Sequence, residues 1–270
     1  MLSFLFLVTA FQDSSQTYQE LIKAVQKSDV ATVRRILDSG VHPDLTEGGV
    51  RTSYRTALYW ASLFNRNPEA DESIATLLIE RGATLYPGNS SIFHKAASSG
   101  AIGVLRACLK AGSDPNEVHW DRRPLFLAVG RFGQTRGYRT KEAPVRPLMV
   151  KELIGAGADV HLPVKENGSK ALHVAAFNAF PECLKILLDA GADLNEQTFD
   201  DGYTPLHCAL LDDSPECLQT ARILLDRGAR LDLEDVHNRT VEQMVRQKRY
   251  TAAIELIEEY KKKRSPPRGA

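Results

Sequence analysis

Seven histidines are the residues of this sequence best suited to chemistry, because a neutral imidazole binds zinc and exchanges protons near neutral pH. Three of them, His94, His173 and His207, stand at the same position of a recurring sequence unit. Such repetition favours a structural role over metal binding or catalysis. The other four lie in expected turns and have no second histidine or cysteine at zinc-site spacing; they are His42, His119, His161 and His237. We therefore predict no metal site.

Known catalytic motifs do not occur in the sequence, which has no Gly-x-Ser-x-Gly element, no Walker-type phosphate loop and no dinucleotide fingerprint. The acidic pairs Asp200-Asp201 and Asp212-Asp213 lie in expected turns, where aspartate serves turn formation and helix entry. We predict a protein without catalytic residues or cofactors. The alternative is a hydrolase or transferase site in the segment Gly130 to Pro147, which holds basic residues but no cluster of carboxylates or thiols.

The charge balance limits the kinds of partner to expect, and the cysteines indicate their own redox state. Lys plus Arg and Asp plus Glu each total 34, so the formal net charge is zero and no global field attracts nucleic acid or an anionic membrane. The four cysteines, Cys108, Cys183, Cys208 and Cys217, lie in helical patterns without a Cys-x-x-Cys pair, which indicates buried reduced thiols. We expect a monomer that binds no nucleic acid.

A glycine pattern recurs six times near the end of an expected helix: two apolar residues, two mostly polar residues, then the glycine. Each glycine suits the position just after a helix, where φ is positive and a side chain would clash. The six glycines are Gly40, Gly82, Gly112, Gly157, Gly191 and Gly228. The pattern predicts a series of helices that end in the same way.

A second pattern opens the helix that precedes each of these, and it is clearest in Thr204 to Ala209 and in Ala171 to Ala176. Threonine caps such a helix, proline suits its first turn, and small alanines let the paired helix approach closely. Weaker copies begin at Thr56, Ser91 and Pro124. The two patterns together predict repeated helix-turn-helix units.

The sequence Thr204-Pro205-Leu206-His207-Cys208-Ala209, repeated in variant form, resembles the signature of the ankyrin-repeat family. The resemblance implies an all-α solenoid of about seven helix-turn-helix units with β-turn tips, including capping repeats at both ends. It covers residues 17–264, with units near 17–50, 51–88, 89–120, 121–167, 168–200, 201–238 and 239–264. In this family the histidine side chain forms hydrogen bonds within and between the repeat turns.

The departures from the pattern predict the ends of the solenoid and one insertion. The last unit begins Thr240-Val241 and has Tyr260 where the glycine would stand, as in a capping repeat with a polar outer face. Gly130 to Pro147 is inserted between the two helices of the fourth unit and is rich in arginine, so it is either a solvated loop or a contact for an acidic partner. Lys261 to Arg264 begins an expected disordered basic tail, with residues 265–270 at its end.

Two interpretations of the apolar segment 1–16 stay open. The run Met1 to Phe11 is too short to span a bilayer, which needs ~20 residues. Leu2 to Ala10 ends like a signal peptide but lacks a basic start, so the protein is either exported or carries an apolar cover for its first repeat. In the second case we expect it in the cytoplasm, with the nucleus open because of the basic C-terminal run.

The resemblance also implies how the protein works: a non-enzymatic scaffold or adaptor that binds a protein partner through a concave face of first helices and turn tips. The alternative is an exported repeat protein that acts outside the cytoplasm. Aromatic residues and arginine are common interface anchors, and they are frequent at these positions. We therefore predict as partner-binding residues Tyr54, Phe64, Tyr86, Trp120, Arg122, Arg123, Phe177, Phe199 and Tyr203.

Overall fold

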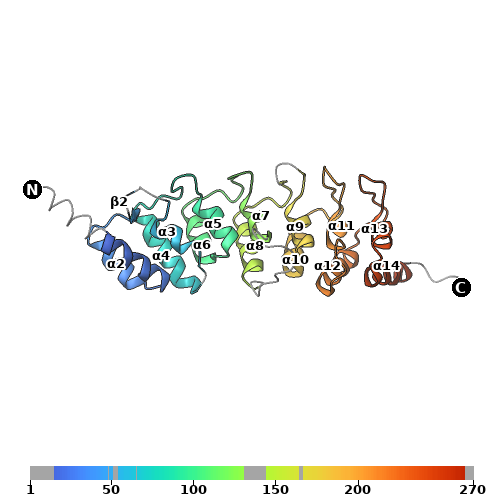
Figure 1. The fold of residues 1–270 in the computed structure, drawn as a ribbon, viewed down its shortest axis with the longest axis horizontal. Coiled ribbons are helices and arrows are strands. Elements are labelled where there is room, and N and C mark those ends of the chain that lie inside the picture. The colour runs from blue at the N-terminus through green and yellow to red at the C-terminus, as the bar shows by residue number, and fades with distance from the viewer. Residues whose placement is uncertain are drawn as a thin grey trace, which may run out of the picture. The chain divides into compact units, whose positions relative to one another are not determined.

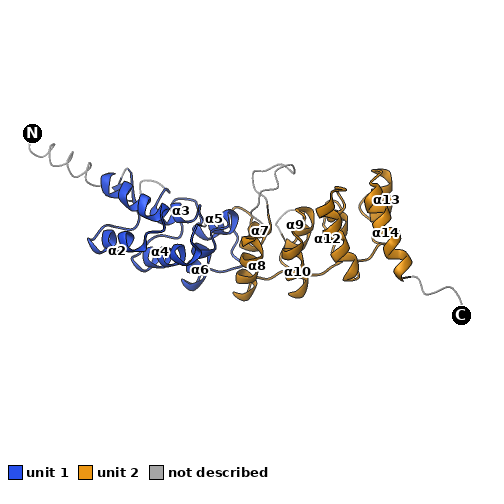
Figure 2. Cartoon of the chain, turned by 90° about the horizontal axis from the view of Figure 1, so that it is seen from below, with its two compact units in different colours: residues 1–119 blue, residues 120–270 orange. Residues whose placement is uncertain are grey.

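The computed structural model describes residues 15–47, 49–50, 54–64, 66–130, 144–163 and 167–264, with only the backbone at Val50. Nearly all of the expected N-terminal segment, the tail 265–270 and residues 131–143 of the insertion lie outside these ranges. The chain divides into two compact units, residues 1–119 and 120–270 (Figure 2). Each unit is described by itself below.

The N-terminal unit consists of helices that follow one another in pairs (Figure 1). It begins with helical residues 15–26 and continues with α2 Val30–Asp38, α3 Ala57–Ala61, α4 Pro68–Glu80, α5 Ile92–Ser99 and α6 Ile102–Lys110. A two-residue antiparallel pairing joins β1 Leu45–Thr46 to β2 Gly49–Val50 in the turn before α3. The second members of the pairs pack in sequence, α2 on α4 and α4 on α6, while α3 packs on α5.

The C-terminal unit repeats this arrangement. Its first helices are α7 Pro124–Val129, α9 Ala171–Phe177, α11 Pro205–Ala209 and α13 Val241–Gln247, and its second helices are α8 Val145–Gly155, α10 Pro181–Asp189, α12 Pro215–Asp226 and α14 Thr251–Arg264. First helices stack on first helices, α7 on α9 and α9 on α11, and second helices stack in the order α8, α10, α12, α14. The turns that connect successive pairs lie on the side of the first helices (Figure 1). The expected all-α repeat fold is confirmed.

The two sequence patterns have the local structures predicted for them. All six repeated glycines adopt a left-handed backbone, with φ between 88° at Gly40 and 96° at Gly157. The Thr204 hydroxyl caps α11 by accepting a hydrogen bond from the backbone N–H of His207 at 3.3 Å, and Thr56, Ser91 and Thr240 cap their helices in the same way. Local sequence therefore sets where each helix begins and ends.

Two predicted boundaries are wrong. The insertion in the fourth unit does not extend to Pro147, because α8 begins at Val145 and proline suits the first turn of a helix. Lys261 to Arg264 do not begin a disordered tail but form the last turn of α14. Cations are favourable at a helix C-terminus. Two of the lysines in this turn also have acidic partners, since Lys263 pairs with Glu259 at 2.7 Å and Lys261 pairs with Glu242.

The core of each unit is built from the inward faces of the paired helices, mainly alanine, leucine and valine. In the N-terminal unit α4 and α6 approach so closely that a Cβ on Gly103 would lie 2.4 Å from the carbonyl oxygen of Pro68. The four cysteines are buried free thiols, as the sequence predicted.

Candidate functional site

The repeated histidines close the start of the first helices. His94 Nε2 donates to the carbonyl oxygen of Glu117 at 3.1 Å while its Nδ1 accepts from the hydroxyl of Ser91 at 2.9 Å. His173 Nε2 likewise donates to the carbonyl of Glu196 at 2.9 Å, and its Nδ1 accepts from the backbone N–H of Lys170 at 3.2 Å. Each imidazole thus ties a helix start to the turn that follows its repeat, which is the predicted structural role.

His207 departs from this scheme. Its Nδ1 contacts the Thr204 hydroxyl at 2.9 Å, but its buried Nε2 has no hydrogen-bond partner among the residues that the structure describes. Burial lowers the pKa of both His173 and His207 below the ordinary value of 6.5. Both imidazoles are therefore neutral at pH 7, and neither brings positive charge to the surface beside it.

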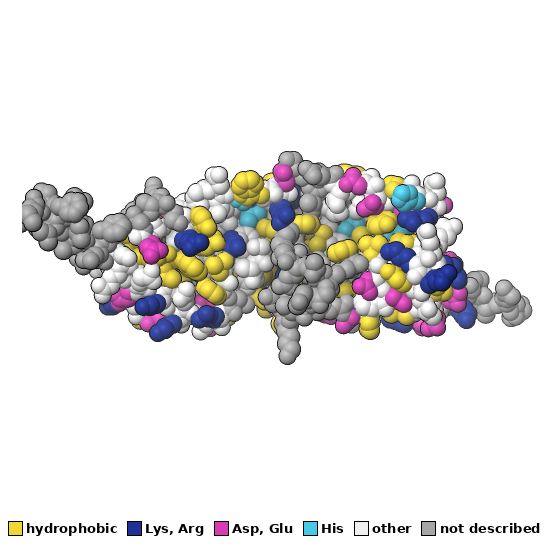
Figure 3. Space-filling model, in the orientation of Figure 1, with side chains coloured by type: hydrophobic (Ala, Val, Ile, Leu, Met, Phe, Trp, Pro, Cys, Tyr) yellow, Lys and Arg dark blue, Asp and Glu magenta, His cyan; other side chains and the backbone are white. Residues whose placement is uncertain are grey.

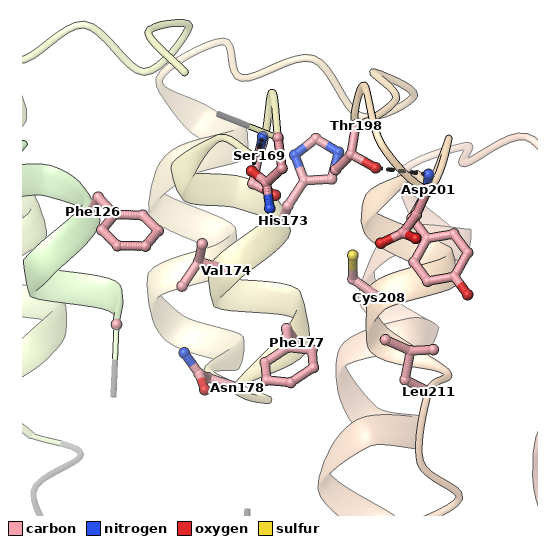
Figure 4. Close-up of a pocket in the computed structure, with 13 residues that line it drawn as sticks. Phe126, Ser169, His173, Val174, Phe177, Asn178, Thr198, Asp201, Cys208 and Leu211 are labelled. Carbon is pink, nitrogen blue, oxygen red and sulfur yellow. Dashed lines mark hydrogen bonds between the residues drawn. The ribbon is translucent and has the colours of Figure 1, made fainter. Parts of the chain in front are cut away.

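A cavity of about 370 Å³ opens between the first helices of the C-terminal unit (Figure 4). Phe126 reaches it from α7, Val174 and Phe177 from α9, and Leu211 follows α11. These side chains form its apolar part. The other lining residues are Gly130, Asn167, Ser169, His173, Asn178, Thr198, Asp201, Tyr203 and Cys208.

The polar edge of the cavity is a tight turn between α10 and α11. The backbone N–H of Tyr203 donates to Thr198 Oγ1 at 3.0 Å, and the N–H of Thr198 donates to the carbonyl of Tyr203 at 3.0 Å. The next turn holds this one in place, because the N–H of Val236 donates to the carbonyl of Asp201 at 3.1 Å. The Asp201 side chain is exposed and lines the cavity at this edge (Figure 4).

Among the described residues that line this cavity, Asp201 is the only one of acidic or basic type apart from the neutral His173. The pKa of Tyr203 is raised, first by burial and then by the negative charge of Asp201. The nearby cations have partners of their own: Arg239 forms a 2.8 Å ion pair with Asp235, and Lys170 forms an ion pair with Glu196. The cavity therefore combines an apolar wall with one negative edge.

A separate group of aromatic residues lies on the N-terminal unit. The rings of Tyr54 and Tyr59 meet edge to face with centroids 5.2 Å apart, and Lys95 Nζ lies 5.9 Å from the centroid of the Tyr59 ring. The guanidinium of Arg66 lies 4.9 Å from the centroid of the Phe64 ring. Hydrophobic and basic side chains gather on the viewed face of this unit (Figure 3).

Comparison with known proteins agrees with this geometry. A family model described as three copies of ankyrin repeats matches residues 145–235. The crystal structure of the human ASB11 ankyrin repeat domain aligns with a TM-score of 0.68 at 20% identity, covering 92% of this chain and 98% of that one. The chain folds as an ankyrin-repeat domain.

A second solved ankyrin repeat domain is similar over most of the chain. It is that of Bcl-3, described as a unique member of the IkappaB protein family, with a TM-score of 0.61, 23% identity and coverage of 88% of this chain and 97% of that one. No curated protein matches the sequence. At these identities the structural likeness establishes the fold.

The ankyrin-repeat arrangement brings together only two of the nine predicted binding residues at the cavity. Phe177, with 40% of its surface exposed, and Tyr203 both line it. Phe199 stands on the same turn but outside the lining, with its ring against Gly168, where a Cβ would lie 2.7 Å from the ring. The remaining six lie elsewhere on the two units.

Trp120, Arg122 and Arg123 lie in the turn before α7 and do not line the cavity. Trp120 is 72% exposed and has φ of 50°, and Asp121 beside it has φ of 59°. A bulky residue seldom adopts this backbone, and such local strain is often found at functional positions. Arg122 is exposed, while Arg123 is half-buried as the cap residue of α7.

The three predicted residues of the N-terminal unit differ in their surroundings. Tyr54 is exposed against Tyr59, and Phe64 is half-buried beneath Arg66. The Tyr86 hydroxyl donates to the carboxylate of Glu117 at 2.7 Å, and burial together with this bond raises the pKa of Tyr86 to about 12. Tyr86 thus also links two successive turns.

Sequence reasoning missed several residues of the cavity wall, including Phe126, Val174 and Thr198. A signal for them was present. Phe126 occupies the repeat position that His173 and His207 hold in the next two units, so a ring that faces the turns was predictable there. Val174 and Cys208 share the following repeat position, which the prediction assigned to no face.

Within the described ranges, no three histidine, cysteine, aspartate or glutamate side chains are grouped so that they could hold a metal ion. None of the helices in the part of the chain that the structure describes is long and apolar enough to cross a membrane. Ankyrin repeats in general are non-catalytic protein-interaction modules.

Proposed function

We propose that this protein is a non-enzymatic scaffold or adaptor that binds a protein partner through the face formed by its first helices and turns. The observation that carries the proposal is the cavity of about 370 Å³ at the ends of α7, α9 and α11. Binding pockets are concave and largely apolar, with a few polar groups that fix orientation. This cavity has that composition.

The exposure of Phe177 supports the same conclusion. Phe177 is 40% exposed, although Ala176, the residue before it in α9, is completely buried. An exposed aromatic side chain at a concave surface is a typical interface anchor, since its apolar area is removed from water only when a partner binds. Trp120, at 72% exposure on a strained turn, is a second anchor in this proposal.

Affinity capture with three variants tests the proposal. Phe177→Ala combined with Leu211→Ala removes apolar area from the cavity wall, Trp120→Ala removes the exposed ring of the turn, and Glu182→Ala changes an exposed residue of the second helix α10. We expect a captured protein to be lost with the cavity variant, weakened with Trp120→Ala and retained with Glu182→Ala. The partner is then purified and its direct binding measured, with thermal unfolding as the check that each variant is folded.

Retention of the same partner by the cavity variant and its loss with Glu182→Ala would contradict the proposal. The second helices would then form the binding surface, and the first helices would serve only the packing of the repeats.

A further inference from the structure

We infer that the cavity of the C-terminal unit takes a lysine or arginine side chain of the partner, with its aliphatic stem against the apolar wall and its charged end at Asp201. This inference rests on the proposed function, because it names the chemistry of the partner segment that the same face would bind. It goes beyond that proposal, because a protein-binding face can be occupied by side chains of any class.

The lining of the cavity has an apolar part and a polar edge. Its apolar lining comes from Phe126, Val174, Phe177 and Leu211, and a polar edge comes from the turn 198–203 (Figure 4). Lysine and arginine have the matching division, since their methylene stems cover apolar surface while the charged end stays at a polar edge. A purely apolar side chain would leave the polar edge without a partner.

Asp201 gives the polar edge of the cavity a negative charge. The Asp201 carboxylate has no hydrogen bond or ion pair with any residue in the described ranges, so its charge is available to a ligand. The exposed Asp200 lies directly beside it, and Asp212 follows Leu211 at the other end of the wall. Acidic, basic and hydrophobic side chains all face the viewer in this unit (Figure 3). A cation is therefore favoured over an anion at this edge.

Among the residues that the structure describes, two cations of this unit have acidic partners of their own. Arg239 is held by Asp235 at 2.8 Å, and Lys170 is held by Glu196. Lys248 Nζ lies 3.5 Å from the carbonyl oxygen of Leu211 and 5.5 Å from the centroid of the Tyr250 ring. It therefore lies beside Leu211, in the apolar part of the lining. His173 adds no charge, because its burial keeps the imidazole neutral at pH 7.

Aromatic rings in the lining also favour a cation. Phe177 and Tyr203 come from neighbouring repeats and both line the cavity. An ammonium or guanidinium group close to an aromatic face is attracted by the ring electrons, and arginine in particular stacks on such faces. The lining therefore offers a basic side chain two aromatic rings in addition to the carboxylate.

Selection from a displayed library of random linear peptides tests the inference, with the full chain as the immobilised target. Selected peptides are synthesised, and their affinities are measured for the full chain and for three variants: Asp201→Asn, Phe177→Ala and Asp200→Asn. Asp200→Asn is the matched control, since it removes the same charge from a neighbouring exposed residue outside the lining. Each peptide is also made with norleucine in place of its basic residue, which keeps the stem and removes the charge.

We expect the selected peptides to share a lysine or arginine next to an apolar residue. Asp201→Asn weakens their binding by about three- to tenfold, Phe177→Ala by about tenfold or more, and Asp200→Asn by less than about twofold. With the norleucine peptide, Asp201→Asn has no further effect, because the charge that it contacts is already gone.

Two other outcomes separate the inference from the proposed function. Peptides that need Phe177 but have no basic residue, or that bind Asp201→Asn as tightly as the full chain, would overturn the inference and leave the protein-binding face in place. If no selected peptide needs Phe177, the proposed function of this face fails, and the inference fails with it.

Discussion

The ring of Tyr203 lies parallel to the imidazole of His207, with ring centroids 5.6 Å apart and an angle of 4° between the planes. Tyr203 lines the cavity, whereas His207 is buried at the start of α11 and closes the cap with Thr204. The lining of the cavity and the cap of α11 are therefore connected through one stacked pair of rings, those of Tyr203 and His207. A charge on His207 would act both on the stability of α11 and on the ring at the cavity.

The stability of the protein should fall in weak acid. Burial lowers the pKa of His173 and His207 below 6.5, so the unfolded chain binds protons that the folded chain does not as the pH falls below 6.5. The free energy of unfolding should decrease by up to about 1.3 kcal/mol per imidazole between about pH 7.5 and about pH 5.5. Urea unfolding at a series of pH values measures this slope.

His207→Gln is the control for that experiment. In the last repeat Gln243 occupies the equivalent position, and its Oε1 accepts from the backbone N–H of Thr240 at 2.8 Å. Glutamine can therefore keep the cap while it removes the titrating group. The variant should unfold with a smaller dependence on pH than the natural chain, and an unchanged dependence would show that His207 does not cause it.

Gly103→Ala should destabilise the N-terminal unit. The added Cβ would lie 2.4 Å from the Pro68 carbonyl oxygen and 2.6 Å from the Glu72 nitrogen, so α4 and α6 must move apart. Such overpacking costs about 1–3 kcal/mol. Gly155→Ala is the matched control in α8, since nothing lies within 4 Å of its Cβ position. Chemical denaturation should show a loss for the first variant and no loss, or a small gain, for the second.

Asp235 should be more important for folding than the nearby Asp232. The buried Asp235 carboxylate accepts from the backbone N–H groups of His237 and Arg239 and pairs with the Arg239 guanidinium at 2.8 Å; these bonds hold its pKa below the ordinary value despite burial. Asp235→Ala removes the buried acceptor of two backbone N–H groups and of the Arg239 guanidinium, and should cost about 2 kcal/mol or more. Asp232→Ala, at an exposed ion pair with Arg230, should leave the unfolding midpoint unchanged. Equal effects would contradict this account of the turn.

The cysteines should react with a thiol reagent in a fixed order. Burial raises the pKa of Cys108 and Cys183 to about 12, so they carry almost no thiolate at pH 7. Cys208 lines the cavity and is the most exposed of the four, at 8%. Mass spectrometry after brief labelling should find Cys208 modified first and the others only after unfolding. Early modification of Cys108 would show that the N-terminal unit opens locally.

Most of the fold was predictable from the sequence, because short-range features determine it. Thr204 and Thr240 act as caps, the repeated glycines take positive φ, and His94 and His173 join helix starts to turns, all as the residue types require. The errors arose where two local signals compete. Pro147 was taken as part of a loop, although proline also suits the first turn of a helix, and Lys261 to Arg264 were taken as a tail, although they complete α14.

The candidate site was less predictable. The repeat register predicts Phe177 and Tyr203 as partner-binding residues from their positions at a helix end and a turn, and both line the cavity. It does not say that Trp120, an exposed residue of the turn before α7, stands outside the lining. That distinction depends on how side chains of α7 and α9 meet in space, which a one-dimensional pattern of residue types does not encode.

Site-specific photocrosslinking tests the central claim most directly. A photoreactive phenylalanine analogue is placed at Phe177 on the cavity wall or at the exposed Glu182 on α10, and each protein is irradiated with the captured partner. The account predicts a covalent product from position 177 and little or none from position 182. A product from position 182 alone would place the partner on the second helices and contradict the account.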